Sequence, residues 1–210
     1  PALGQLCSLN KLRKIKMIYL WILSECPNKH IAVYDREASA DYFMFRKGIK
    51  LTKEQVDKPL IFSLEVTQAE ILRYDAIPNN SASPLVNQKI IDILLELAPD
   101  DVQFFDAQVR CKDGTLTSYK LLNIAHEIFG IDHEHSVYTL MKMSAVKAIS
   151  GFRYLTYLPR CMGKHKLARD KEYRSNLLSS EEVKQAFERN KIKGVRFVKP
   201  EDFYGPKKYI

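Results

Sequence analysis

The stretch from Ser175 to Val198 constrains the fold more than any other part of the chain, because it predicts strand, helix, turn and strand in close succession. Ser179 and Glu182 have the spacing of a capping box, in which two side chains satisfy free amide groups at a helix start. Gly194 supplies a turn before the second strand. One helical face carries the apolar residues Val183, Ala186 and Phe187. This unit provides a packing surface and contains no reactive group.

A second helix is predicted after the loop at residues 77–84. Ser83 is expected to cap it, and Pro84 suits the first helical position. Pro99 is expected to end it. Apolar residues recur between them at helical spacing, at Val86, Ile90, Ile93, Leu94 and Leu97. This amphipathic pattern predicts that the helix lies on a sheet.

Short segments rich in aromatic and β-branched residues predict about eight to ten strands. Lys112-Asp113-Gly114 indicates a hairpin between two of them, and residues 144–150 suit a single helical turn. The main candidates are Met17–Leu23, Ile31–Tyr34, Tyr42–Phe45, Pro59–Val66, Val102–Cys111, Thr115–Ile124, Val137–Met143 and Phe152–Leu158. The predicted class is therefore α+β, with a mainly antiparallel sheet of short strands and two clear helices packed on it.

The length of 210 residues fits one domain over residues 17–210, with an N-terminal subdomain at 17–99 as an alternative. Residues 1–16 carry four basic residues and no acid, and we expect them to be an upstream extension before a natural start at Met17. The apolar run that follows is too short to cross a bilayer. Four scattered cysteines without a CxxC pair indicate free thiols and a cytoplasmic location.

Catalytic and cofactor motifs are missing from the sequence. The glycines form no phosphate-binding loop, and GxSxG is absent, so we predict no catalytic or cofactor-binding residue and no enzyme activity. Three weaker patterns are better explained without catalysis or metal binding. The residues His126, Asp132, His133 and His135 could form a metal site, but a solvated loop is the favoured interpretation. Cys161 and His165 lack a third, orienting group for nucleophilic catalysis. A hydrated edge is the favoured interpretation of Asp100, Asp101 and Asp106.

The stretch 151–174 is the most basic part of the interior, with seven Lys or Arg residues against Asp170 and Glu172. Its interleaved aromatic residues would suit stacking on nucleic-acid bases, and the same combination is typical of protein interfaces. An ordinary basic surface over core tyrosines is the third interpretation. We take the partner-binding candidates to be Arg153, Tyr154, Tyr157, Arg160, Lys164 and Lys166.

Several segments together resemble a bacterial immunity protein family, formerly a domain of unknown function, whose members neutralise the toxin domain of a polymorphic toxin. These segments are Tyr74-Asp75 leading to Pro84-Leu85-Val86, Val102 to Asp106, Tyr119 to Ile124, Ile131-Asp132 up to Tyr138, Leu167-Ala168-Arg169, and Leu177 through Phe197. Their order resembles the eleventh immunity group, with the forty-third as a similar alternative. Residues 150–166 are longer and more basic than in that family, and the part up to Lys58 resembles nothing we can name.

The resemblance implies a non-enzymatic protein that binds a cognate toxin domain. It also implies that the protein binds no cofactor or metal and does not associate with a membrane. A nucleic-acid-binding protein that uses residues 151–174 is the alternative. A hydrolase that uses His126 or Cys161 is the weakest interpretation.

Overall fold

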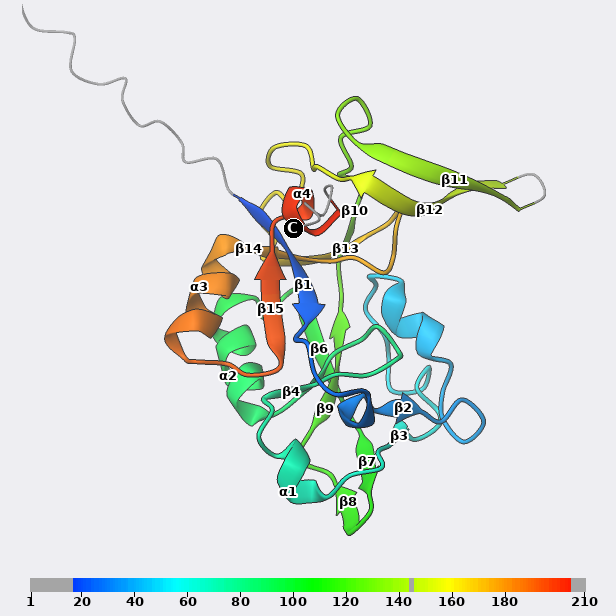
Figure 1. Cartoon of the computed structure of the whole chain (residues 1–210), viewed down its shortest axis with the longest axis vertical. Coiled ribbons are helices and arrows are strands. Elements are labelled where there is room, and N and C mark those ends of the chain that lie inside the picture. Colours follow the sequence, from blue (N-terminus) through cyan, green and yellow to red (C-terminus); the bar gives the residue numbers. More distant parts are fainter. Residues whose placement is uncertain (1–16, 144–145, 205–210) are drawn as a thin grey trace, which may run out of the picture.

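The computed structural model describes residues 17–143 and 146–204, and in them the chain forms fifteen strands and four α-helices. The strands lie in three sheets and one separate hairpin, and most neighbours are antiparallel. The predicted α+β class is confirmed. Figure 1 shows the two longer helices together on one side of the sheets and the hairpin projecting at one end.

The five-stranded sheet joins the beginning of the described chain to its end. Strand β1 lies between β14 and β15 and pairs antiparallel with both, which confirms the predicted first strand. Only β10 and β13 are parallel in this sheet. In spatial order the strands are β10 (Glu127–Ile128), β13 (Leu167–Asp170), β14 (Leu177–Ser180), β1 (Ile18–Leu23) and β15 (Val195–Val198).

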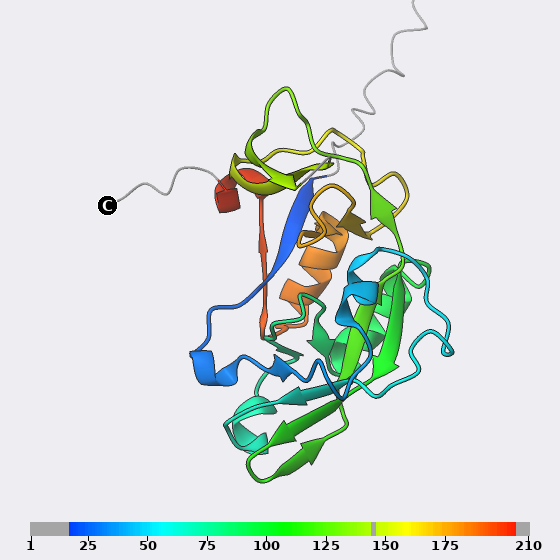
Figure 2. The same cartoon turned by 90° about the vertical axis from the view of Figure 1, so that its right-hand side faces the viewer.

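Two four-stranded sheets make up the opposite half of the molecule (Figures 1 and 2). One has the order β2 (Val33–Tyr34), β3 (Ile61–Ser63), β7 (Gln108–Cys111) and β8 (Gly114–Leu116). The other has the order β4 (Ala76–Ile77), β5 (Leu85–Val86), β9 (Lys120–Ile124) and β6 (Val102–Asp106). The hairpin predicted at Asp113-Gly114 is confirmed, but each arm divides in two because the chain passes from one sheet into the other at Ala107 and after Leu116.

The two longer helices, α2 (Gln88–Leu97) and α3 (Glu181–Arg189), pack against each other and against the sheets. The short helices are α1 (Gln68–Ile71) and α4 (Pro200–Tyr204), and 3-10 turns occupy Asn28–His30 and Tyr42–Arg46. The core between α2, α3 and the sheets contains Trp21, Ile90, Leu94, Leu122, Leu177, Val183 and Phe187. The predicted amphipathic faces of both helices are confirmed.

Both predicted helix starts are too early, by four residues for α2 and by one residue for α3. Helix α2 is capped by Asn87, whose side chain accepts from the Ile90 amide, because Leu85 and Val86 are already paired in β5. Helix α3 is capped by Ser180, whose hydroxyl accepts from the Val183 amide at 3.4 Å. The hydroxyl of Ser179 instead donates to the Ser180 carbonyl. The capping-box pattern therefore marks this helix one residue too early.

Two further predictions of local structure are corrected. Residues 42–45 form a 3-10 turn rather than a strand, since the Asp41 carboxylate accepts from the Phe43 amide and starts the turn. Phe45 is fully buried from that turn. The helical turn expected at residues 144–150 is a strand from Val146 onward, and residues 144–145, like the expected extension 1–16, lie outside the described residues.

Candidate functional site

The projecting hairpin consists of β11 (Val137–Met143) and β12 (Val146–Tyr154), which pair only with each other among the described strands. Figure 1 shows the hairpin extending sideways from one end of the molecule. The pairing register shifts between Val137 and Tyr138 and again between Thr139 and Leu140. Both long edges of the hairpin therefore lack a described partner strand, which is the arrangement that other chains use for docking.

The base of the hairpin is held by Phe152 on β12. Its ring lies 5.0 Å from the ring of Tyr204 on α4 and 5.1 Å from that of Tyr173. Tyr138 packs against Phe152 from β11. Ile149 packs on the neighbouring core cluster. These contacts fix the direction of the hairpin.

The hairpin exposes large apolar side chains both at its base and farther along its strands. Leu140 and Met141 are each 46% exposed, and Val137 is 53% exposed directly opposite Tyr154. Arg153 is exposed beside them. Apolar and aromatic side chains next to an arginine are characteristic of protein–protein interfaces.

The segment that follows β12 lies at the same end of the molecule (Figure 1) and contains further basic residues. Arg160 and Lys164 are exposed, while Met162 between them is buried. Backbone hydrogen bonds join Gly163 to Arg160 and His165 to Met162, which fixes the segment as successive tight turns. Residues 146–166 contain five basic residues and no acid. We call residues 137–143 and 146–166 the hairpin–loop surface.

Two of the six predicted partner-binding residues do not lie free on this surface. Tyr157 is 7% exposed, and its hydroxyl donates to Asp170 Oδ2 at 2.5 Å and accepts from Asn176 Nδ2 at 3.0 Å. Burial and the Asp170 charge raise the pKa of Tyr157. Lys166 is half-buried and forms an ion pair with Glu182 of α3. The structure therefore leaves Arg153, Tyr154, Arg160 and Lys164 exposed and assigns Tyr157 to the core.

The histidines of the proposed metal cluster turn to separate partners. His133 contacts the Tyr138 hydroxyl at 2.9 Å and the Glu172 carboxylate at 2.7 Å, while His135 contacts Asp132. His126 stacks on His165 instead, with 3.4 Å between ring centroids. Within residues 17–143 and 146–204, no group of three or more metal-ligating side chains converges.

Asp101 is the polar residue that the sequence interpretation misplaced. It is buried, and its carboxylate lies 2.5 Å from His165 Nδ1 and accepts the amide of Lys166 at 2.7 Å. Asp101 is therefore not part of a hydrated edge. It gives His165 the orienting partner that the sequence did not reveal.

This pairing does not create a nucleophile at Cys161. Burial raises the pKa of the Cys161 thiol to about 11, so that the thiol stays protonated near neutral pH. The hydrogen bonds of the described chain include none between Cys161 and His165. The Asp101–His165 pair is best understood as a bridge between the start of β6 and the start of β13.

The sequence model of the Immunity protein family (Imm11) matches residues 26–202. The match includes the segment up to Lys58, which from the sequence alone resembles no family. No curated protein matches the chain. None of the helices in residues 17–143 and 146–204 has the length and hydropathy needed to cross a bilayer.

Proposed function

The chain belongs to the Imm11 family of immunity proteins, and on that premise we propose that it binds a cognate bacterial toxin domain and neutralises it without catalysing a reaction. The observation that carries the proposal beyond the family is the hairpin–loop surface. It combines exposed apolar side chains, an arginine and a basic loop on one end of the molecule. The cytoplasm is the proposed location, because a toxin that acts inside the cell must be met there.

The geometry of this surface favours tight binding. The hairpin is anchored at Phe152 by ring contacts, and the loop after it is held by its own backbone hydrogen bonds. A surface that is already ordered loses little conformational entropy when a partner binds. A small shape-matched patch of this kind can supply most of the binding energy of a complex.

The charge of the surface indicates the kind of toxin face that it fits. With Arg153, Arg160 and Lys164 exposed and no acid in residues 146–166, it complements an acidic patch on the toxin domain. It does not imitate the phosphate backbone of a nucleic acid. Among the described aromatic residues of 151–174, only Tyr154 is exposed, so the stretch offers few stacking platforms for bases.

The test uses the toxin domain encoded by the neighbouring gene, co-expressed and co-purified with this protein. Leu140→Asp and the pair Arg153→Glu with Arg160→Glu alter the apolar and the charged parts of the surface separately. We expect each to weaken the complex at least tenfold, which corresponds to about 1.4 kcal/mol. The affinity is measured by calorimetry, and protection is measured as survival of cells that express the toxin domain.

Matched controls lie at the far end of the molecule. Val33→Asp changes an exposed apolar residue on β2, and Arg110→Glu reverses an exposed charge on β7. Both should leave affinity and protection unchanged. If the control variants weaken the complex and the surface variants do not, the toxin-binding surface lies elsewhere. If the wild-type protein ignores the toxin but binds generic DNA or RNA with a steep salt dependence, the proposed function is wrong.

A further inference from the structure

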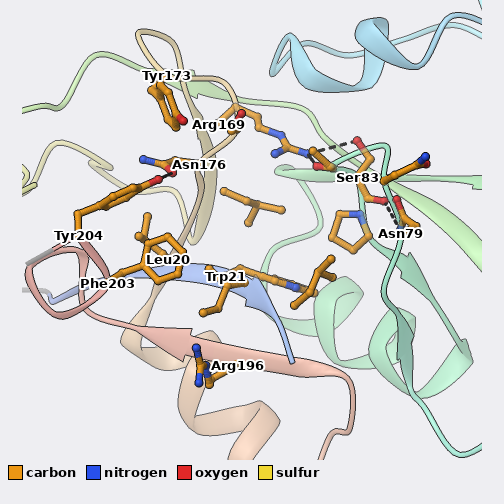
Figure 3. A pocket seen from close by; sticks show the side chains of 17 residues that line it. Leu20, Trp21, Asn79, Ser83, Arg169, Tyr173, Asn176, Arg196, Phe203 and Tyr204 are labelled. Atoms are coloured by element: carbon orange, nitrogen blue, oxygen red, sulfur yellow. Dashed lines mark hydrogen bonds between the residues drawn. The ribbon is translucent and has the colours of Figure 1, made fainter. Parts of the chain in front are cut away.

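A pocket of about 450 Å³ opens between the five-stranded sheet, the loop before β5 and helix α4 (Figure 3). Its volume falls within the range of about 300–1,000 Å³ that is usual for small-molecule sites. Strand β14 pairs with β1 only as far as Leu20, so residues 21–23 of β1 run on past it and form one wall. The seventeen lining residues come from segments far apart in the sequence.

The wall contains a buried arginine, Arg169 of β13, which is 1% exposed. Figure 3 shows its guanidinium reaching toward Ser83. Its Nη2 donates to the Ala82 carbonyl at 2.7 Å and to the Ser83 hydroxyl at 3.3 Å, and its Nη1 lies 3.5 Å from the Arg174 carbonyl. Every one of these acceptors is neutral. A buried charge without an opposite charge is costly, and an arginine in such a place is normally paired with a carboxylate.

The charges near Arg169 increase this imbalance. None of the lining residues is acidic, and the other charged one, Arg196, pairs with Glu25 at 3.2 Å. Arg46 lies close enough to Arg169 to repel it and donates to Ser175 on the pocket wall at 2.8 Å. Burial, and then the Arg46 charge, lower the pKa of Arg169 to about 9, so the guanidinium stays protonated near neutral pH.

Two of the lining residues also carry unsatisfied donors. The Arg169 Nε–H and the Trp21 Nε1–H are buried and have no hydrogen-bond partner among the described residues. The remaining wall is largely apolar or aromatic, with Leu20, Leu177 and Phe203 beside Trp21. A ligand that suits these walls carries acceptor atoms and negative charge at one end and an apolar body at the other.

We propose that this pocket binds a small monocarboxylate with an apolar body, whose carboxylate lies at the Arg169 end. The carboxylate supplies the negative charge that the wall lacks, and charge-assisted hydrogen bonds from guanidinium to carboxylate are among the stronger polar contacts in proteins. The volume exceeds what one acidic side chain of a protein partner would fill, which favours a free small molecule. The inference does not depend on toxin binding.

The chain itself provides the reporter for the test. Trp21 is the only tryptophan of the sequence and lines the pocket, so its fluorescence reports on this site. The purified protein is titrated with hexanoate and, separately, with its neutral analogue hexanamide. We expect a saturable change with hexanoate and at least tenfold weaker binding of hexanamide. Thermal unfolding gives a second readout, because a ligand that binds only the folded protein raises its midpoint.

Variants locate the interaction. Arg169→Met should remove the preference for hexanoate over hexanamide, while Arg153→Gln, on the hairpin, should keep it. If Arg169→Met does not fold, Arg169→Lys replaces it, and we expect that variant to keep the preference for hexanoate with reduced affinity. The comparison of hexanoate with hexanamide on the wild-type protein tests the proposal without any variant. Equal affinity for the two ligands, or no saturable response to hexanoate, overturns the proposal. Stronger binding of a blocked peptide with one glutamate would assign the pocket to a protein partner and would also overturn it.

Discussion

Tyr157 belongs to the stretch that the sequence marks as a partner surface, yet its side chain is part of the core. Its hydroxyl joins Asp170 and Asn176, two polar groups that are themselves mostly buried. Tyr157→Phe leaves both without this partner, so we expect the free energy of unfolding to fall by about 1–3 kcal/mol. Urea denaturation measures that loss. Toxin affinity should stay within twofold of the wild type, and a tenfold loss with unchanged stability would show that Tyr157 contacts the partner after all.

His126 makes the stability of the fold depend on pH. Burial, and then the neighbouring His165, lower the pKa of His126 below its ordinary value of 6.5, against weaker opposing effects of Asp101 and Glu127. As the pH falls below that value, the imidazole of His126 is protonated more readily in the unfolded chain than in the folded one. The free energy of unfolding therefore decreases as the pH drops. Acidification from neutral pH to about one unit below the ordinary histidine pKa should lower the free energy of unfolding. We expect this decrease to be smaller in His126→Gln than in the wild type.

Urea unfolding at the two pH values measures this effect in the wild type and the variant. His135→Gln is the control, because His135 is exposed and forms only a local contact with Asp132. If the His126 variant and the wild type lose the same stability on acidification, the assignment to His126 fails.

At the scale of elements, Gly194 determines how the unit of β14, α3 and β15 attaches to the rest of the molecule. Its φ of +95° suits glycine, and a Cβ there would lie 2.0 Å from the Ala76 carbonyl oxygen of β4. The preceding Lys193 carbonyl accepts the amides of Asp75 and Ala76. Gly194→Ala must therefore displace backbone, and we expect it to lower the free energy of unfolding by more than about 2 kcal/mol.

Chemical denaturation measures this cost, with Gly151→Ala as the matched control. A Cβ at Gly151 would meet nothing within 4 Å, and its φ is not among the positive ones, so the change should stay within about 0.5 kcal/mol. Similar losses for the two variants would mean that the close approach at Ala76 relaxes at little cost.

The elements that could be predicted from the sequence are those whose signals are local. Helix α3, the end of α2 before Pro99 and the turn at Asp113-Gly114 each depend on neighbouring residues. Leu85 and Val86 fall within the predicted helix but form β5, because pairing with β9 satisfies their backbone and buries both side chains. The partner strand β9 lies more than thirty positions away in the sequence, so the local spacing of residues could not predict this pairing.

Basic and aromatic composition predicts a partner surface within residues 151–174, and the structure shows Arg153, Tyr154, Arg160 and Lys164 of that stretch to be exposed. That these residues bind a partner stays a prediction. Composition could not distinguish Tyr154, which faces solvent, from Tyr157, whose partners Asp170 and Asn176 come from β13 and the turn after it. Arg169 was counted with the basic surface, because only the fold shows it buried beside a pocket.

For the whole molecule, the pairing of strands bears on the number of folding units. Strand β1 pairs with β14 and β15, β3 pairs with β7, and β5 pairs with β9. Each pair links the part before residue 99 to the part after it, so we expect a single cooperative unfolding transition. Scanning calorimetry tests this expectation, since the calorimetric and van't Hoff enthalpies of one such unit coincide. Two separate transitions would instead support the N-terminal subdomain at 17–99.

The position of β1 between β14 and β15 also has a consequence for biosynthesis. A ribosome that has released the chain only up to residue 176 holds a nascent polypeptide in which strand β1, with Trp21, still lacks both of its neighbours. Translation must pass Leu177 before that strand can begin to be covered, and such late closure of distant contacts slows folding. Throughout elongation, the apolar segment Ile18–Leu23 is a natural binding target for chaperones.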